Sequence, residues 1–353
     1  METSDTTAAR WSRAQKILFR FGFVYVVLYA LEHPFGAPFG DLIESASSFI
    51  WDRLVPWVGA HVLALSEPIT IFPAGSGDTT YNYVQIFTLL VLAAVGCLIW
   101  TLLDRKRPNY DKLLSWFTLG VRYYLAFVLL AYGFVKVIKV QFGTPSLERL
   151  VTPFGETSPM GLLWSFMGHS TPYTMFTGLG EVTAGLLLFF RRTTTLGALV
   201  AFGVMLHVMM LNFSYDVPVK LFSTHLVLLA TFLILRDINR IANFFVLNRA
   251  TEPVALRPLF SKRWMNRAAL AFKVIVIGYV VVTGLYGARQ SQKQWGHLRS
   301  QPALYGLYEV ETFVQNGDTL AAVLTDTTRW RRLIVEWPGR ANIHAMDNTR
   351  LPY

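Results

Sequence analysis

The chain has 353 residues, of which 53% are hydrophobic and 15% are charged, and its mean hydropathy is +0.39. Because this apolar content exceeds that of an ordinary soluble domain, the composition predicts a membrane protein. The net charge of +10 does not indicate a nucleic-acid partner, since the basic residues are spread over several connecting segments. The single cysteine, Cys97, excludes an internal disulfide, a CxxC redox pair and a cysteine-ligated metal.

Apolar runs long enough to cross a bilayer core of about 30 Å are spaced along the whole sequence. The first contains Arg20 and the fourth contains Glu181. The predicted fold class is therefore an all-α polytopic membrane protein with about seven transmembrane helices and a small β-rich extramembrane module at the C-terminus. The predicted spans are residues 17–31, 84–103, 116–140, 175–190, 196–213, 219–235 and 268–286.

The distribution of lysine and arginine predicts the orientation, because these residues in short loops are retained on the cytoplasmic side. The basic flanks of the spans all fall on one side, whereas the segment 32–83 between the first two spans is mainly acidic. We therefore expect a bacterial inner-membrane protein with a cytoplasmic N-terminus and a periplasmic C-terminus. The first run lacks a cleavage pattern, so we expect it to stay as an anchor.

These spans divide the chain into eight predicted segments, two of which carry helices that lie in the membrane interface. Apolar residues at helical spacing predict one such helix within 42–65, kinked or split at Pro56, and another at 237–248. The segments are a cytoplasmic tail (1–16), a first transmembrane helix (17–31), a periplasmic segment (32–83), a second helix with its basic loop (84–114), a group of four helices (115–235), a basic cytoplasmic connector (236–267), a last transmembrane helix (268–288) and a periplasmic tail (289–353).

The periplasmic tail changes to a strand-like composition. Runs at 307–315 and 330–337 read as strands, and the dipeptide Asn316-Gly317 follows the first of them. Asn-Gly is the strongest short signal for a two-residue hairpin. A module of about sixty residues buries little core by itself, so we expect it to dock on the outer face of the helices.

Four ionisable residues lie inside apolar runs: Lys136, Glu181, His207 and His225. An ionisable group among acyl chains costs several kcal/mol unless it is paired or faces a wet cavity, so intramembrane charges favour a functional site. The runs alternate in direction, and at 1.5 Å per residue all four residues fall near one depth toward the outer face. We expect Lys136 to pair with Glu181, His207 to meet His225, and the four to line one polar site.

Each of the four also has a structural explanation. A single intramembrane histidine often serves as a hydrogen-bonding strut between helices. Lys136 can extend its ammonium group to the outer interface. Glu181 lies among the small residues Gly178, Ala184 and Gly185, which allow close helix approach, so it can be part of a buried structural pair.

The short connector between the fifth and sixth spans supplies further candidates for substrate or cofactor binding: Asn212, Tyr215, Asp216 and Lys220. The connector holds only a few residues and so makes the two spans antiparallel neighbours. Asp216 and Lys220 can equally form a solvated salt bridge, and Tyr215 suits the aromatic belt of a membrane interface.

Two histidines at one depth allow three kinds of chemistry. They could ligate a b-type haem axially if the helices splay apart. They could bind a quinone, since its carbonyl oxygens need a donor and its reduction needs protons, which His, Lys and Glu supply. They could also form a transition-metal site together with Glu181.

One stretch resembles a known family. Residues 178–194, which run Gly-Leu-Gly-Glu-Val-Thr-Ala-Gly and end in Arg191-Arg192 and two threonines, are preceded by Gly133-Phe-Val-Lys136 and followed by the apolar run 196–211. This pattern resembles the DoxX-like membrane proteins over residues 115–235. The segment 212–225 is similar to larger members with extra spans and a C-terminal extension.

The resemblance implies a four-helix DoxX-like core at 115–235, with Glu181 and Lys136 at positions of the family pattern. The family is related to the DoxD subunit of thiosulfate:quinone oxidoreductase, so the resemblance implies a membrane redox role. A complete thiosulfate-oxidising site is not evident, because the one cysteine lies within a span.

The leading hypothesis is a membrane subunit of a quinone-linked oxidoreductase, which exchanges electrons or protons with the quinone pool and a periplasmic or membrane redox partner. In it Glu181 carries protons, His207 and His225 orient the quinone oxygens, and Lys136 tunes Glu181. The alternatives are a small-molecule or lipid carrier, and a non-catalytic scaffold that recruits a periplasmic partner through an open strand edge of the tail.

Overall fold

The computed structural model describes residues 10–72, 77–253, 260–296 and 298–352. The chain forms two compact units: a helical unit, Met1–Phe134 with Thr177–Leu285, and a mixed unit, Val135–Phe176 with Tyr286–Tyr353. Part of the predicted cytoplasmic tail, residues 1–9, lies outside the described residues. Three helices continue from one unit into the other: α4 (Asp111–Val137), α7 (Thr171–Phe189) and α11 (Arg263–Gln294).

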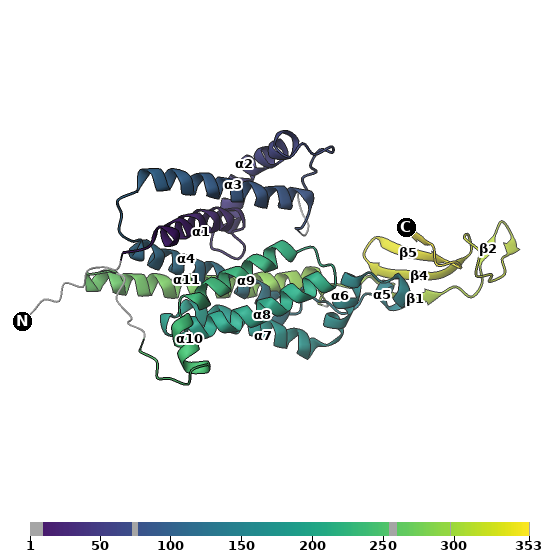
Figure 1. Ribbon diagram of the computed structural model, residues 1–353. Coiled ribbons are helices and arrows are strands. Elements are labelled where there is room, and N and C mark those ends of the chain that lie inside the picture. The colour runs from purple at the N-terminus through teal and green to yellow at the C-terminus, as the bar shows by residue number, and fades with distance from the viewer. Residues whose placement is uncertain (1–9, 73–76, 254–259, 297, 353) are drawn as a thin grey trace, which may run out of the picture. The chain divides into compact units, whose positions relative to one another are not determined.

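The helical unit contains pairs of antiparallel helices that pack side by side. Helix α1 lies beside α3, and α8 lies beside α9 (Figure 1). A short 3₁₀ turn, η2 (Arg191–Thr193), joins α7 to α8. The remaining helices of this unit are α1 (Arg13–Glu32), α2 (Gly40–His61), α3 (Thr80–Leu103), α8 (Thr194–Ser214), α9 (Lys220–Leu235) and α10 (Ile238–Phe245).

The structure supports a membrane protein with several spanning helices. Within the described residues, five helical segments are long and apolar enough to cross a membrane, and α9 with α10 makes a sixth if the bent pair is one span. The predicted fourth span coincides with α7, which has 19 residues and is not in this set. Glu181 and a polar first turn make α7 less apolar than the others, so the count of seven stays a prediction.

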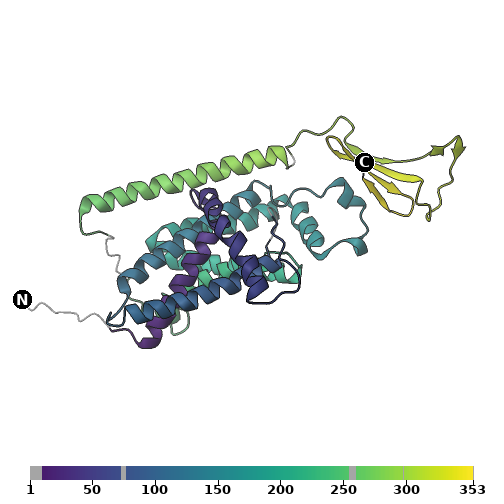
Figure 2. The same ribbon diagram turned by 90° about the horizontal axis from the view of Figure 1, so that it is seen from above.

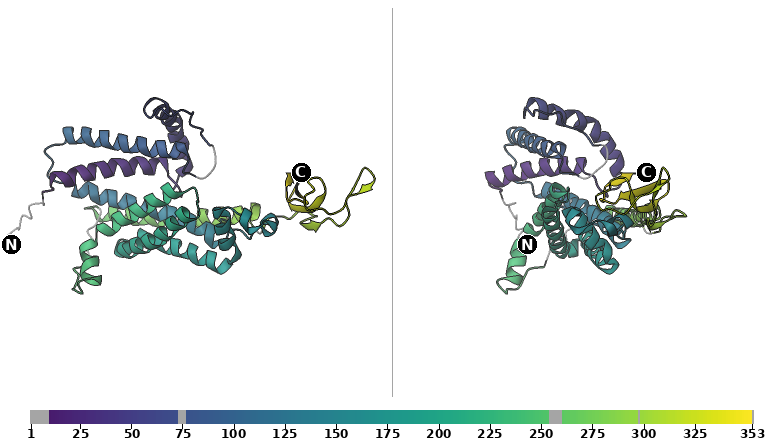
Figure 3. Two further views of the ribbon diagram at one scale, coloured as in Figure 1. Left: turned by 45° about the vertical axis from the view of Figure 1, so that its right-hand side comes forward. Right: turned by 90° about the vertical axis from the view of Figure 1, so that its right-hand side faces the viewer.

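The two predicted interfacial segments are both helical. Helix α2 runs without a break through Pro56, so of the two expected outcomes the split is wrong, and the kink stays a prediction. Its exposed apolar side chains include Leu42, Phe49 and Trp57. Helix α10 is bent by 75° from α9 and lies across its direction (Figures 1 and 3).

Helix α11 is one uninterrupted helix of 32 residues (Figure 2). It extends beyond both ends of the predicted last span. Long apolar side chains on it are exposed, including Phe272, Ile275 and Val282. Such a helix buries its apolar surface only in a lipid environment or against further protein.

A buried arginine fixes the start of the helical unit. The Arg20 side chain is 3% exposed. Its Nε and Nη2 donate to the Tyr110 hydroxyl at 2.9 and 2.7 Å, and Nη1 donates to the Thr101 hydroxyl at 2.9 Å. Nη2 also donates to the carbonyl of Asp104 at 2.7 Å. A guanidinium on the first span is therefore bonded to the end of α3 and the loop after it, which explains how this span tolerates a charge.

Small residues bring α4 and α7 into close contact. A Cβ built on Gly133 would lie 2.6 Å from Val182 Cγ2 and 3.0 Å from the carbonyl oxygen of Gly178. A Cβ on Gly185 would lie 3.0 Å from the carbonyl oxygen of Ala126. The glycines therefore set the distance between the two backbones, and Glu181 lies in this contact with 1% of its surface exposed.

The mixed unit contains α5 (Leu147–Val151), a 3₁₀ turn η1 (Phe154–Glu156), α6 (Pro159–His169) and an antiparallel four-stranded sheet. The strand order is β1-β4-β5-β6, and a separate two-stranded hairpin pairs β2 with β3. The strands are β1 (Gly306–Glu309), β2 (Val314–Gln315), β3 (Asp318–Thr319), β4 (Trp330–Trp337), β5 (Arg340–Ala345) and β6 (Arg350–Pro352).

The predicted Asn-Gly hairpin is confirmed, but it does not join the two predicted strands. Asn316 and Gly317 have φ of 55° and 95° and connect β2 to β3. The run 307–315 is broken, because its first half belongs to β1 and pairs with β4. The helices α5 and α6 fall in a segment for which the sequence predicted no element.

One carboxylate joins α5 to the sheet. Glu148 accepts hydrogen bonds from His344 Nε2 at 2.8 Å, Arg350 Nε at 2.6 Å and Asn342 Nδ2 at 3.3 Å. In addition, the backbone N–H of Leu147 donates to the Glu336 carboxylate at 3.3 Å. These bonds tie the segment between α4 and α7 to the strands of the tail.

We expect Gly133→Ala to destabilise the protein by about 1–3 kcal/mol, because the added methyl overlaps Val182 and the α7 backbone. The matched control is Gly120→Ala on the same helix, where nothing lies within 4 Å of the added Cβ and the better helix propensity of alanine stabilises. Thermal unfolding of the purified variants measures the difference, and equal midpoints would contradict the close packing of α4 on α7.

Candidate functional site

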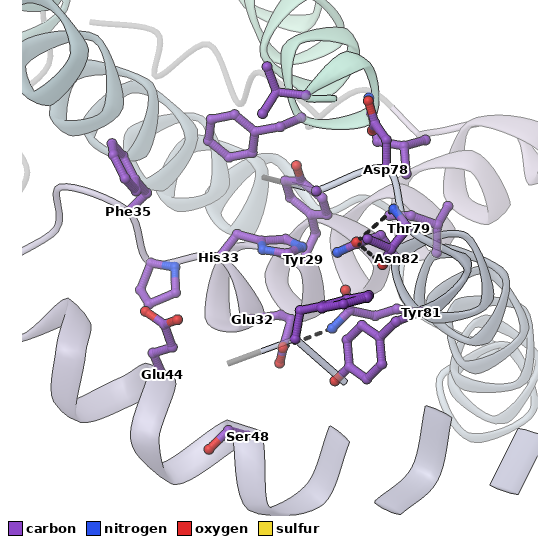
Figure 4. Close-up of a pocket in the computed structure, with 18 of the residues that line it drawn as sticks. Tyr29, Glu32, His33, Phe35, Glu44, Ser48, Asp78, Thr79, Tyr81 and Asn82 are labelled. Atoms are coloured by element: carbon purple, nitrogen blue, oxygen red, sulfur yellow. Dashed lines mark hydrogen bonds between the residues drawn. The ribbon is translucent and has the colours of Figure 1, made fainter. Parts of the chain in front are cut away.

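A pocket of about 630 Å³ lies within the helical unit, between the end of α1, the helix α2, the start of α3 and the start of α9 (Figure 4). Its volume lies in the range of small-molecule sites, about 300–1,000 Å³. We call it the acidic pocket. The residues on which the argument depends are Tyr29, Glu32, His33, Phe35, Glu44, Ser48, Asp52, Asp78, Thr79, Tyr81, Asn82, Gln85, Tyr132 and Phe222.

Two buried oxygen atoms at this pocket have no hydrogen-bond partner among the described residues. Gln85 donates from Nε2 to Glu32 Oε1 at 2.8 Å, which leaves Gln85 Oε1 and Glu32 Oε2 unsatisfied. Gln85 is 1% exposed. The nearby hydroxyl of Ser47 donates to the carbonyl of Glu44 at 3.1 Å. A buried acceptor without a donor costs about 1–3 kcal/mol, so these atoms mark a place where a ligand or water donates.

The other acidic residues of the pocket differ in their hydrogen-bond partners. Asp78 accepts the backbone N–H groups of Lys220 and Leu221 at 2.5 and 2.9 Å, and so caps the first turn of α9. Asp52 accepts the hydroxyl of Tyr81 at 3.2 Å. Asp78 is therefore structural, whereas the carboxylates of α2 and Glu32 face the open volume (Figure 4).

An aromatic stack joins α1 to α9 beside the pocket. The ring of His225 lies on Tyr29 with centroids 4.1 Å apart and planes inclined by 10°. His225 Nδ1 lies 2.7 Å from the carbonyl oxygen of Leu221, so this nitrogen carries the hydrogen. Nε2 therefore accepts the hydroxyl of Tyr25 at 2.6 Å. Both ring nitrogens of His225 are thus committed to protein partners.

His33 continues the stack at the wall of the pocket. Its ring centroid lies 4.8 Å from that of Tyr29, and its carbonyl accepts the hydroxyl of Tyr124 at 2.8 Å. Burial, together with the neighbouring His225, lowers the pKa of His33 to about 4. The imidazole is therefore neutral at pH 7 and does not offset the charge of the carboxylates.

The four predicted intramembrane residues have different surroundings. Lys136 and Glu181 are buried, with 5% and 1% of their surface exposed, and their predicted ion pair stays a prediction. His207 is exposed on α8 and has no hydrogen-bond or ring partner among the described residues. His225 faces Tyr25 and Tyr29 of α1. The structure therefore does not bring His207 to His225.

The connector residues serve mainly to hold α8 and α9 together. Asn212 is buried and donates from Nδ2 to the hydroxyl of Ser223 at 3.0 Å. Lys220 and Asp216 form an ion pair of 2.6 Å, of which the Asp216 side chain is 80% exposed. Tyr215 ends α8 and is half-buried. None of Asn212, Tyr215, Asp216 and Lys220 lines the acidic pocket, although their neighbours Val219 and Leu221 do.

The haem interpretation does not fit these residues. An axial ligand needs a free imidazole nitrogen, and His225 has none. Among the residues that the structure describes, no group of three or more His, Cys, Asp or Glu side chains is placed to hold a metal ion.

Sequence reasoning missed the pocket because it treated the acids of 32–83 only as a topology signal. Two signals were present in the sequence. Tyr25, Tyr29 and His33 recur every four residues and so share one face of a helix. In addition, Asn82 and Gln85 place two amides in the first turns of an otherwise apolar span.

The fold and these buried polar contacts define a multi-pass α-helical membrane protein. The chain belongs to the same family as the uncharacterized protein YwoB of Bacillus subtilis, to which it is 32% identical over 143 residues. The match covers 40% of this chain and 87% of YwoB. No family model matches the sequence, and no solved structure matches the fold.

We expect Tyr25→Phe to destabilise the helical unit by about 1–2 kcal/mol, because Nε2 of the buried His225 loses its donor. The matched control is Tyr83→Phe on α3, where the tyrosine is 52% exposed. The midpoint of thermal unfolding in detergent measures the effect. If both variants unfold at the wild-type temperature, His225 does not depend on this bond.

Proposed function

We propose that this chain is a membrane carrier protein that binds a small molecule in the acidic pocket. The observation that carries the proposal is a pair of oxygen atoms, Gln85 Oε1 and Glu32 Oε2, that have no partner within the described ranges and lie at a pocket of about 630 Å³. Buried polar groups in native proteins nearly always have partners. Those that lack one at the wall of a cavity favour a ligand that supplies it.

The construction of the pocket also favours a binding site. Its described lining residues come from the helices α1, α2, α3, α4 and α9 and from the segments that follow α1 and precede α3, so that helix packing fixes their relative positions. The stack of His225 on Tyr29 holds one wall, and the capping of α9 by Asp78 holds another. Binding sites are usually largely pre-formed in this way.

The topology is part of the proposal. We place the N-terminus in the cytoplasm and the acidic segment 32–83 on the periplasmic side of a bacterial inner membrane, as the lysine and arginine distribution favours. The acidic pocket then opens near the periplasmic face, where α2 lies in the interface.

The test uses α2, which offers a matched pair of serines. Ser48 lines the pocket, whereas Ser45 is exposed on the same helix and does not. Because an indole fills a small site, we expect Ser48→Trp to reduce small molecules that copurify with the protein at least about tenfold, whereas Ser45→Trp keeps them. Mass spectrometry of the solvent extract of each purified variant measures this.

Equal sets of copurifying molecules in Ser48→Trp, Ser45→Trp and the wild type would contradict binding in the pocket. The two variants should show the same elution profile in gel filtration and the same unfolding midpoint, which separates loss of ligand from loss of fold.

A second candidate function is the quinone-linked oxidoreductase subunit of DoxX type. It is favoured by Tyr132, whose ring lines the pocket and lies within electrostatic range of the buried Glu181. Tyr132 and Glu181 lie next in sequence to Gly133 and Val182, and the close contact of Gly133 with Val182 places them on adjoining turns of α4 and α7. A quinone takes up protons and electrons in equal number, so an intramembrane carboxyl behind a phenol suits proton supply.

In this second candidate, the four-helix DoxX-like core spans 115–235, the spans number seven, and the electrons come from a redox partner protein. We expect Glu181→Gln to lower quinone-dependent electron transfer in isolated membranes about 100-fold, at wild-type amounts of folded protein. The control is Glu67→Gln, at an exposed position outside the pocket. Unchanged transfer in Glu181→Gln, or an extract without quinone, would argue for the carrier.

A further inference from the structure

The charge of the acidic pocket is unbalanced. Four carboxyl groups line it, from Glu32, Glu44, Asp52 and Asp78, and none of the described residues that line it is a lysine or arginine. The ammonium of Lys220, which lies between the lining residues Val219 and Leu221 in the chain, is paired with Asp216. The nearest arginine along α2, Arg53, turns away and places its guanidinium 3.7 Å from the centroid of Phe49. His33 adds no compensating charge, because it is neutral at pH 7. A positive ligand is therefore favoured electrostatically.

The pocket also has more hydrogen-bond acceptors than donors, which again favours a ligand that donates. Glu32 Oε2 and Gln85 Oε1 are acceptors that receive no hydrogen bond from the part of the chain that the structure describes. The carboxylate of Glu44, which α2 contributes to the lining, adds further acceptors (Figure 4). Gln85 has 1% of its surface exposed and belongs to the lining of the pocket. A ligand that carries N–H donors satisfies these atoms, whereas an anion or a donor-free ligand does not.

The remaining walls are aromatic. Phe35 and Tyr132 stack with centroids 4.6 Å apart, and Phe222 lies 6.2 Å from Phe35. Tyr29 and Tyr81 also line the volume. Aromatic faces attract cations and pack well against rings and alkyl groups, so the site suits a cation with an apolar body.

We propose that the acidic pocket binds an organic molecule with a primary or secondary ammonium group and an aryl or alkyl body. This rests on the proposed carrier function and specifies its substrate class. The ammonium donates to Gln85 Oε1 and to the Glu32 carboxylate, and the body packs on the aromatic walls. A bare metal ion does not fill a volume of about 630 Å³.

An ammonium group can come from a free amine or from an ethanolamine phospholipid. The lipid carries a phosphate close to its ammonium, and in this pocket that phosphate meets the carboxylates of Glu44 and Asp52. Like charges at short range repel, so the structure favours the free amine.

The experiment measures binding of three probes to the full-length protein in detergent by calorimetry at pH 7. They share one ring: 2-phenylethylamine, the neutral 2-phenylethanol, and trimethyl(2-phenylethyl)ammonium, which keeps the charge but has no N–H. We expect the primary amine to bind at least about tenfold more tightly than either analogue, with about 1.4 kcal/mol for each factor of ten.

The matched variants again come from α2. We expect Glu44→Gln to weaken binding of the amine about tenfold, whereas Asp41→Asn, an exposed acid on the same helix that does not line the pocket, leaves it unchanged. Ser48→Trp should abolish binding. Competition of the amine by phosphatidylethanolamine, but not by phosphatidylcholine, in mixed micelles would instead assign the ammonium to a lipid.

Several outcomes would overturn the proposal. Equal affinity for the amine and the alcohol would show that charge is not recognised, and equal affinity for the quaternary analogue would show that the N–H donors are not. No binding of any probe would exclude this substrate class. In each case the loss of copurifying molecules in Ser48→Trp still decides separately whether the pocket binds a small molecule.

Discussion

The helical unit depends on one constraint: a polar group between apolar helices needs a partner from another element, because neither lipid nor packed side chains replace water. Arg20 meets this constraint through Tyr110, Thr101 and the Asp104 carbonyl. His225 meets it through Tyr25 and its own helix, and Asn212 through Ser223. Each of these contacts joins two segments of the chain. The same hydrogen bonds therefore offset the free-energy cost of burying a polar group and determine which helices pack against each other.

The acidic pocket is the place where this rule is relaxed. Gln85 donates a hydrogen bond to Glu32, but the second side-chain oxygen of each residue receives none from the described residues. The Asp78 carboxylate, in contrast, accepts backbone N–H groups at the start of α9. The surrounding contacts offset the free-energy cost of these unsatisfied atoms. The ring of His225 stacked on Tyr29 and the Asp78 cap on α9 hold the walls of the pocket in place without a ligand. Rigid walls with unmet acceptors, the lack of lysine and arginine among the described lining residues and several aromatic faces are the features on which the proposed organic-cation site rests.

The sequence predicted the helices well because apolar periodicity is local, and it predicted the Asn316-Gly317 turn for the same reason. It did not predict which faces meet. The depth of His207 and His225 along their helices is similar, but depth says nothing about rotation, and α8 and α9 turn these side chains to different surroundings. The run 307–315 shows the same limit, since its alternation continues although its two halves pair with different strands. Of the candidate site, the sequence shows beforehand only the stripe of Tyr25, Tyr29 and His33 and the two amides of Asn82 and Gln85.

The bonds of Glu148 have a consequence for the order of folding. His344, one of its partners, lies 196 residues further along the chain. While the polypeptide emerges from the ribosome, the α5 carboxylate must therefore stay hydrated until strands β5 and β6 have been made. The segment between α4 and α7 thus completes these contacts late in biosynthesis, after the helices on either side of it have been made.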